Sequence, residues 1–284
     1  VGSEMCIRDR LKVDRTDPRP RVLIQGEFWA KTTEGEGNYN LFRFLESEGA
    51  EVVTESVSDW LLHQVWRAKW SAERRESLVQ HDEGGSGMGE QRNPTRAKWT
   101  MMAVDRIFRA VFYTYARALG LKGYRLTDHD ALAELSNQYM DSHLGGGEDH
   151  MEIGHHLHTV KHRLANMVLS VKPFTCLSSN GVSDGIQPVI TELYPQSVFV
   201  SVETNGDAPA NFYSRVQMQL FKAKKSAQRD MAEALAQTGL TLGEVRAYAA
   251  THPSLNHPLH VYPQHFGCVT ANMVMEVFAR RAGR

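Results

Sequence analysis

Cys176 is the residue whose position most suggests chemistry, because it lies where an apolar run ends and a polar loop begins, in VKPFTCLSSNGVSD (171–184). A cysteine in such a place is a buried small apolar residue, a thiolate ligand of an iron–sulfur cluster or zinc, or a nucleophile. A metal or cluster needs further ligands, which would come from sequence beyond this chain or from a partner. A nucleophile needs a base, and no residue at a diagnostic spacing supplies one. The residues alone leave all three interpretations open.

The loop after Cys176 is rich in small polar residues and precedes an expected helix. Backbone amides and hydroxyls at the N-terminus of a helix suit an anionic or polar ligand. The side chains expected to contact such a substrate here are Ser178, Ser179, Asn180, Ser183 and Asp184. Capping of the helix by Ser183 or Asp184 is the simpler alternative, and the two roles are compatible.

His158 and His162 are a second candidate, because residues four apart in a helix share one face and can bind zinc at this spacing. The HExxH arrangement is absent. A solvated or substrate-facing histidine face is therefore the alternative. Two Gly-rich segments, 84–89 and 145–147, do not follow a strand, so they are predicted to be linkers and not phosphate-binding loops.

These residues must be positioned by strands and helices, which the spacing of apolar residues predicts. Short apolar runs with β-branched residues predict strands at 21–26, 51–54, 173–177 and 197–202. Apolar residues at helical spacing predict helices at 38–48, 60–80, 98–119, 130–139, 153–169, 185–194, 208–236 and 271–279. The polar, Gly-containing stretch 81–94 predicts a flexible linker.

Alternation of strands and helices indicates an α/β fold, here a flavodoxin- or Rossmann-like lobe with about four mainly parallel strands and a helical insertion. The lobe would comprise 20–56 and 151–284, and the insertion 57–150. Residues 1–19 are interpreted as a disordered or artefactual leader and are excluded from the fold. Ligands of such sheets gather at the carboxyl ends of the strands. This rule places Cys176 in the expected site region, where Glu27 and Glu203 are expected to contact a substrate.

The composition is that of an ordinary globular protein. The chain has 284 residues, of which 42% are hydrophobic and 23% charged, and its formal net charge is -1. This balance gives no reason to expect nucleic acid or an anionic membrane as a partner, and no apolar run approaches the length of a membrane span. The 3 cysteines are too few for a disulfide framework, which favours a cytoplasmic location.

Four short motifs together resemble a known family. They are GEFW (26–29), KPFTCLS (172–178), the strand end ET (203–204) and the helix opening NFYSRVQM (211–218). The series is similar to the 2-hydroxyacyl-CoA dehydratase component family, and most to the dehydratase-like C-terminal region of proteins fused to an acyl-CoA dehydratase activase. The likeness covers roughly residues 20 to 280, and the helical middle is its least distinctive part.

The resemblance implies two flavodoxin-like lobes with a 4Fe–4S or double-cubane cluster held by cysteines between them. An ATP-dependent activase would reduce the cluster, which then serves the removal of water from a 2-hydroxyacyl-CoA. Cys176 matches a cluster ligand of the family. Many family members carry Gly-Cys-Pro after the first strand, whereas this chain has Gly26-Glu27-Phe28. The other ligands would lie in an N-terminal lobe outside this chain, so the chain alone is expected to be inactive and without a cluster.

Two other classes of function compete with this one. The first is a non-enzymatic module that binds acyl-CoA or docks an activase. The second is a zinc hydrolase that uses His158 and His162. The substrate, the role of Cys268 and the oligomeric state do not follow from the sequence.

Overall fold

The computed structural model describes residues 11, 13–79, 93–121, 123–142, 148–176, 184–205 and 209–283. Most of the expected linker, 81–94, therefore lies outside the described residues. The first part of the expected leader, 1–10, lies outside them entirely. The chain forms two compact units. The first comprises Val1–Thr54 and Leu132–Arg284, and the second is Glu55–Ala131.

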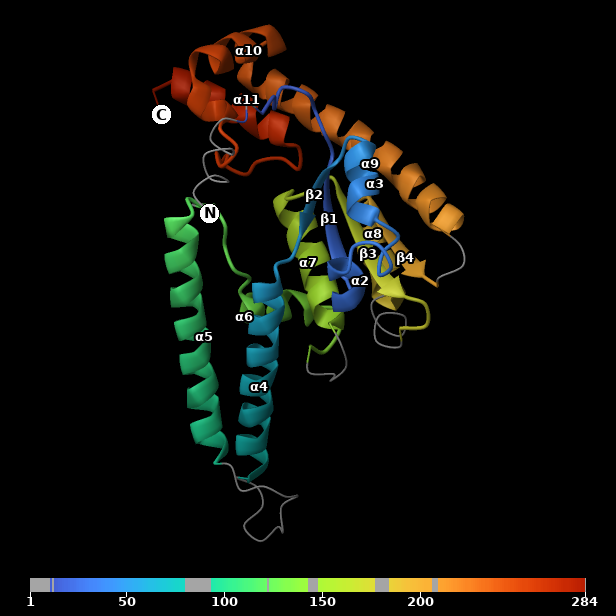
Figure 1. The fold of residues 1–284 in the computed structure, drawn as a ribbon, viewed down its shortest axis with the longest axis vertical. Coiled ribbons are helices and arrows are strands. Elements are labelled where there is room, and N and C mark those ends of the chain that lie inside the picture. Colours follow the sequence, from blue (N-terminus) through green and yellow to red (C-terminus); the bar gives the residue numbers. More distant parts are fainter. Residues whose placement is uncertain are drawn as a thin grey trace. The chain divides into compact units, whose positions relative to one another are not determined.

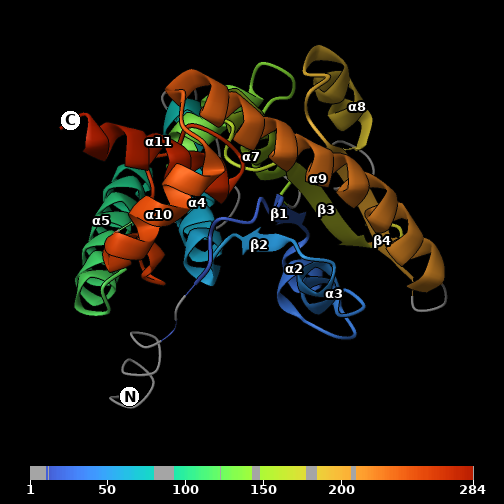
Figure 2. The same cartoon turned by 90° about the horizontal axis from the view of Figure 1, so that it is seen from above.

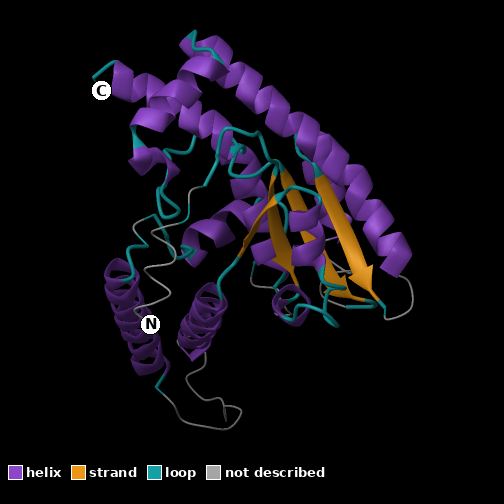
Figure 3. Ribbon diagram, turned by 45° about the horizontal axis from the view of Figure 1, so that its top comes forward, coloured by secondary structure: helices purple, strands orange, loops and turns teal. Residues whose placement is uncertain are grey.

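A four-stranded sheet is the centre of the first unit. Its strands are β1 (Arg21–Gly26), β2 (Glu51–Thr54), β3 (Met167–Pro173) and β4 (Phe199–Thr204), in the spatial order β2-β1-β3-β4. Every pair is parallel, so the arrowheads in Figure 3 point towards one edge. The α/β fold is thereby confirmed, and the strand order is that of flavodoxin-like sheets.

One face of the sheet carries the main hydrophobic core. Ile24, Leu169 and Val200 are in register on neighbouring strands, and their side chains point to this face. There they pack against α3 (Leu41–Ser47) and α9 (Pro209–Thr238). The long helix α9, orange in Figures 1 and 2, crosses this face. It contributes Phe212, Val216 and Leu220, all nearly inaccessible to solvent, to the core.

The opposite face of the sheet is covered by α7 (Asp149–His162) and α8 (Asp184–Leu193). These two helices share a smaller apolar cluster made of Met140, Ile153, Leu157 and Ile190. The alternate side chains of β3 and β4 point to this face, and several of them are polar. The sheet is thus apolar on the α9 side and partly polar on the α7 side.

Two expected elements around β3 are wrong. The expected strand at 173–177 is replaced by β3 at Met167–Pro173, and α7 ends at His162 although the sequence predicts helix to residue 169. Arg163 adopts a left-handed backbone, with a φ of 50°, and ends the helix. The following stretch is buried on both faces, so its nearly continuous apolar run cannot be told from a buried helix by spacing alone.

The C-terminal part of the first unit is helical. A second apolar cluster joins α9 to α10 (Leu242–Thr251), the short 3-10 helix η2 (Pro253–Asn256) and α11 (Val269–Arg281). Of these, α10 and η2 are not predicted from the sequence, and neither is the short helix α2 (Phe28–Thr32). Residues 13–19 of the expected leader pack here, because Arg15 donates hydrogen bonds to the carbonyl oxygens of Pro258 and His260, each at 2.9 Å.

The second unit is built on two long antiparallel helices, α4 (Val57–Val79) and α5 (Pro94–Ala118), which lie side by side in Figure 1. Ion pairs of Lys98 with Glu73 and Glu76, at 3.3 and 3.9 Å, tie them together. The boundary between the units falls inside α6 (His129–Ser136). Among the helices that the structure describes, none has the length and apolar character needed to cross a membrane.

Candidate functional site

The carboxyl ends of β1 and β3 form the point where the sheet changes its winding direction. The chain leaves β1 towards α3 on one face, and it leaves β3 towards α8 on the other face. Ligands of doubly wound sheets bind at such a switch point. The structure places Glu27 directly after β1 and the turn of Cys176 directly after β3. Glu203 lies beside Lys172 in register on β4, so all three expected edge residues lie at this edge.

Cys176 lies in a tight turn that follows β3 and is only partly buried. Its backbone N–H donates to the carbonyl oxygen of Pro173 at 3.2 Å, which closes a four-residue turn. The third residue of this turn, Thr175, has a φ of 60°. Turns of this kind usually place Gly there, because a β-branched residue is strained at positive φ. The strained backbone therefore fixes the place of the thiol at the switch point.

Glu27 caps the helix after β1. Its Oε2 accepts a hydrogen bond from the backbone N–H of Ala30 at 3.0 Å, and its own N–H donates to the carbonyl oxygen of Val171 at 3.0 Å. Gly26 makes this crossing possible, since its φ is +117° and an added Cβ would lie 2.1 Å from the Val171 oxygen. The carboxylate expected to contact substrate thus has a structural role that engages one of its oxygens.

Asp184, the first residue of α8, forms an ion pair between its Oδ2 and Nζ of Lys172. Its Oδ1 accepts a hydrogen bond from the Ser201 hydroxyl at 3.1 Å. The other four loop residues expected to contact substrate, namely Ser178, Ser179, Asn180 and Ser183, lie outside the described residues. Of the expected ligand loop, the structure therefore places only its last residue.

A buried polar layer lies between the sheet and helices α7 and α8. We define it as Gln25, Glu152, Ser170, Lys172, Asp184 and Ser201. Lys172 is 0% exposed, and Glu152, 2% exposed, accepts a hydrogen bond from the Ser170 hydroxyl at 2.8 Å. Gln25 is also 0% exposed, and its amide has no hydrogen-bond partner within the part of the chain that the structure describes. Burying ionised and amide groups is costly unless they are paired, so this layer is an unusual feature of a sheet interior.

The sequence contains a signal for this layer that the strand assignment overlooked. In MVLSVKP, the polar residues Ser170 and Lys172 are two apart, and Gln25 interrupts the apolar run of β1. Strands of parallel sheets are buried on both faces and normally read as continuous apolar runs. Polar residues at alternate positions of such a run point to a polar interior on one face.

A further buried ion pair involves a lysine of α2. Lys31, 3% exposed, forms an ion pair with Glu148, the residue that precedes α7, at 3.3 Å. This pair therefore ties α2 to the N-terminal end of α7.

His156 on α7 is fully buried and links α8 to the start of β4. Its Nδ1 bonds Oε1 of Gln187, and its Nε2 lies 2.8 Å from the Ser197 hydroxyl. Because the Gln187 oxygen can only accept, Nδ1 carries the proton and Nε2 accepts from Ser197. Burial lowers the pKa of His156 to about 4, against the opposing effect of the hydrogen bond to Gln187. The imidazole is therefore neutral at physiological pH.

The described residues do not make a metal centre. No group of three or more His, Cys, Asp or Glu side chains is positioned to hold a metal in the described ranges. His158 and His162 do lie close, with ring centroids 4.6 Å apart. The pKa of His158 is lowered, mainly by burial and to a smaller extent by the nearby His162 and His155. Zinc needs at least a third protein ligand, and a cluster needs more thiolates than Cys176 alone supplies. The residues placed by the structure therefore do not fit either group by themselves.

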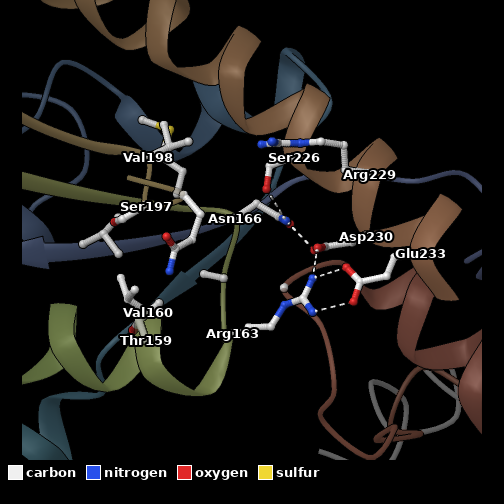
Figure 4. Close-up of a pocket in the computed structure, with 15 residues that line it drawn as sticks. Thr159, Val160, Arg163, Asn166, Ser197, Val198, Ser226, Arg229, Asp230 and Glu233 are labelled. Carbon is white, nitrogen blue, oxygen red and sulfur yellow. Dashed lines mark hydrogen bonds and ion pairs between the residues drawn. The ribbon is translucent and has the colours of Figure 1, made fainter. Parts of the chain in front are cut away.

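A pocket lies at the opposite edge of the sheet, near the amino ends of β3 and β4. Figure 4 shows this cavity of about 250 Å³, in which Arg163 binds both Asp230, at 2.8 Å, and Glu233, at 2.9 Å. Asn166 donates to the same Asp230 at 2.8 Å. The hydrogen bond between Arg163 and Glu233 lowers the pKa of Glu233 and raises the pKa of Arg163. These groups bind one another and tie β3 to α9, so we regard this network as structural.

Cys268 contrasts with Cys176. It is 0% exposed in the C-terminal apolar cluster, and burial raises the pKa of its thiol.

The carboxyl edge offers one partly accessible thiol, two carboxylates and a buried ion pair. This set can bind a polar ligand and donate a single thiolate. No protein-family model, curated protein or solved structure matches this chain.

Proposed function

We propose that this chain is the C-terminal lobe of an iron–sulfur, dehydratase-like component of the 2-hydroxyacyl-CoA dehydratase/activase system. Cys176 would donate one thiolate to a 4Fe–4S or double-cubane cluster, and a second lobe would supply the remaining ligands. An ATP-dependent activase would be the electron donor, acyl-CoA the class of substrate, and the cytoplasm the location.

The observation that carries the proposal is the turn of Cys176 at the switch point. A strained turn costs on the order of 1–3 kcal/mol and persists where the surrounding structure requires it. Here the turn keeps a partly accessible thiol at the edge where flavodoxin-like sheets bind ligands. This position suits a ligand shared between two lobes better than a buried structural thiol.

The test is the iron content and electron paramagnetic resonance spectrum of a preparation that holds this lobe together with its second lobe. Cys176→Ser is expected to lower the iron content and change the spectrum. Cys268→Ala is the matched control, because that thiol is fully buried in an apolar cluster. Unchanged iron and spectrum in Cys176→Ser would refute the ligand role.

A non-enzymatic module that binds acyl-CoA or docks an activase is the second candidate. It is favoured by the partly exposed polar groups at the carboxyl edge, Glu27 and Asp184, which can bind a polar ligand without a cluster. This candidate predicts that Cys176→Ser leaves ligand or activase binding unchanged, whereas the first candidate predicts loss of electron transfer.

A further inference from the structure

A groove of about 800 Å³ lies between α9 and the segment that leads into β4. It is separate from the switch point, because it lies at the amino end of β4 and the switch point at the carboxyl ends of β1 and β3. Its volume is that of a small-molecule site. The proposed dehydratase function does not use this groove, so each can fail without the other.

One wall of the groove carries three cations. Lys222, Lys225 and Arg229 follow one another at helical spacing on α9, and all are exposed. The Lys225 ammonium lies over the ring of Phe221, 4.5 Å from its centroid, and a phosphate would compete with this contact. At 1.5 Å per residue they span about 10 Å along the helix axis. Like charges three and four residues apart destabilise a helix, and no acidic side chain is among the described residues that line the groove.

The nearest carboxylates on α9 are engaged elsewhere. Asp230 and Glu233 both bind Arg163, and Asp230 also binds Asn166. Figure 4 shows these bonds as dashed lines, and Arg229 points away from them. Arg229 lines this cavity as well as the groove, and within the described residues it forms no ion pair with Asp230 or Glu233.

The opposite wall combines apolar surface with hydrogen-bonding groups. Pro195, Val198 and Phe199 supply apolar surface, and one face of the Phe199 ring is stacked on His156, with the ring centroids 4.9 Å apart. Gln196 and Ser197 supply an amide and a hydroxyl. The Ser197 hydroxyl donates to Nε2 of His156 at 2.8 Å, which leaves its oxygen lone pairs available as acceptors. A ligand in this groove would meet cations on one side and apolar and amide groups on the other.

We propose that the groove binds a nucleotide through its phosphates. The phosphates would lie along Lys222, Lys225 and Arg229, and the base would lie on the wall formed by Pro195 and Phe199. Charge complementarity selects a ligand with at least two phosphates, since three cations line about 10 Å of helix. The apolar wall selects a ligand that carries a planar group beyond its phosphates.

Calorimetric titration of the 284-residue chain with ADP, pyrophosphate and adenosine, in low salt without divalent cations, tests the proposal. ADP is expected to bind more tightly than pyrophosphate, and adenosine most weakly. Arg229→Glu is expected to weaken ADP binding by about tenfold or more, because it replaces a charge-assisted contact by repulsion. Raising the salt concentration is expected to weaken binding further.

Arg43→Glu is the matched control. Arg43 is an exposed residue of α3 outside the groove, and its substitution changes the net charge by the same amount. It is expected to change ADP binding by less than about twofold, since surface charges at a distance are screened. Absence of ADP binding at about 1 mM, or an equal loss in both variants, would overturn the proposal. Pyrophosphate binding as tight as ADP would overturn the assignment of a nucleotide.

Discussion

The Lys172–Asp184 ion pair makes an asymmetric prediction, because its two partners differ in burial. The Lys172 side chain is 0% exposed, whereas that of Asp184 is 36% exposed. Asp184→Asn keeps the shape and the oxygen that accepts from Ser201, but it leaves a buried ammonium without its counter-charge. Lys172→Met keeps most of the apolar stem and leaves a carboxylate that water can reach.

The two costs follow from this difference. Removing the partner of a charge that stays buried costs about 3–5 kcal/mol, so Asp184→Asn should lower the free energy of unfolding by that amount. Lys172→Met should cost about 1 kcal/mol or less, because the remaining carboxylate is rehydrated and the pair itself adds little. The double variant should resemble Lys172→Met, since no buried charge remains.

Hydrogen exchange of the β3 amides at increasing denaturant measures these values in the first unit alone. This choice matters because four of the five tryptophans, at 60, 66, 70 and 99, lie in the second unit. Fluorescence would therefore report mainly on α4 and α5. Equal losses in the two single variants, or a double variant as unstable as Asp184→Asn, would show that the ammonium is not confined as described.

Three further predictions concern single residues. Burial depresses the pKa of His156 from 6.5 to about 4, so the unfolded chain takes up the proton first. The stabilisation, about 3 kcal/mol, should be complete above pH 6.5 and lost as pH falls through 4, and His156→Gln should flatten this part of the stability profile. Gly26→Ala should destabilise the sheet by more than about 2 kcal/mol in denaturant unfolding, because its Cβ would lie 2.1 Å from the Val171 oxygen. In a Cys6→Ala background, a thiol reagent should modify Cys176 quickly and Cys268 only upon unfolding, since Cys268 is 0% exposed.

Each of these predictions has a check within the chain. An acid limb that is unchanged in His156→Gln would contradict the first prediction. Gly239→Ala also places an alanine at a positive φ, of +67°, but this value lies in the left-handed α region and no atom is near the added Cβ, so its cost should be the smaller one. A Cys268 thiol that reacts as fast as Cys176 in the folded chain would contradict the burial on which the third prediction depends.

The fold class could be predicted because three of the four strands have local signals. The runs 21–26 and 51–54 are short and bounded by Gly or polar residues, and both match β1 and β2 as observed. The strand at 197–202 is displaced slightly from β4, at Phe199–Thr204. Parallel pairing then follows from the helices between the strands.

The position of β3 could not be predicted, because its end is set by tertiary structure. Nothing local distinguishes Leu164 to Leu169 from a buried helical turn, and the helix ends only because Arg163 adopts a left-handed backbone. The misplaced strand also hid the polar layer, since Ser170 and Lys172 fall between the predicted helix 153–169 and the predicted strand 173–177. The expected gathering of Glu27, Cys176 and Glu203 depended on strand order alone and was therefore insensitive to this error.

The separation of β1 and β3 in the sequence has a consequence for synthesis of the chain. The hydrogen bond from Arg21 to Asn166 joins residues 145 positions apart, with the second unit between them. At about 5–20 residues per second, roughly 7–30 seconds pass before β3 exists to pair with β1. During that interval the apolar run VLIQ has β2 on one side and an open edge on the other, the kind of edge that recruits other chains. The helical hairpin of α4 and α5 needs only local contacts, so we expect it to fold on the ribosome while the first strand still depends on a chaperone.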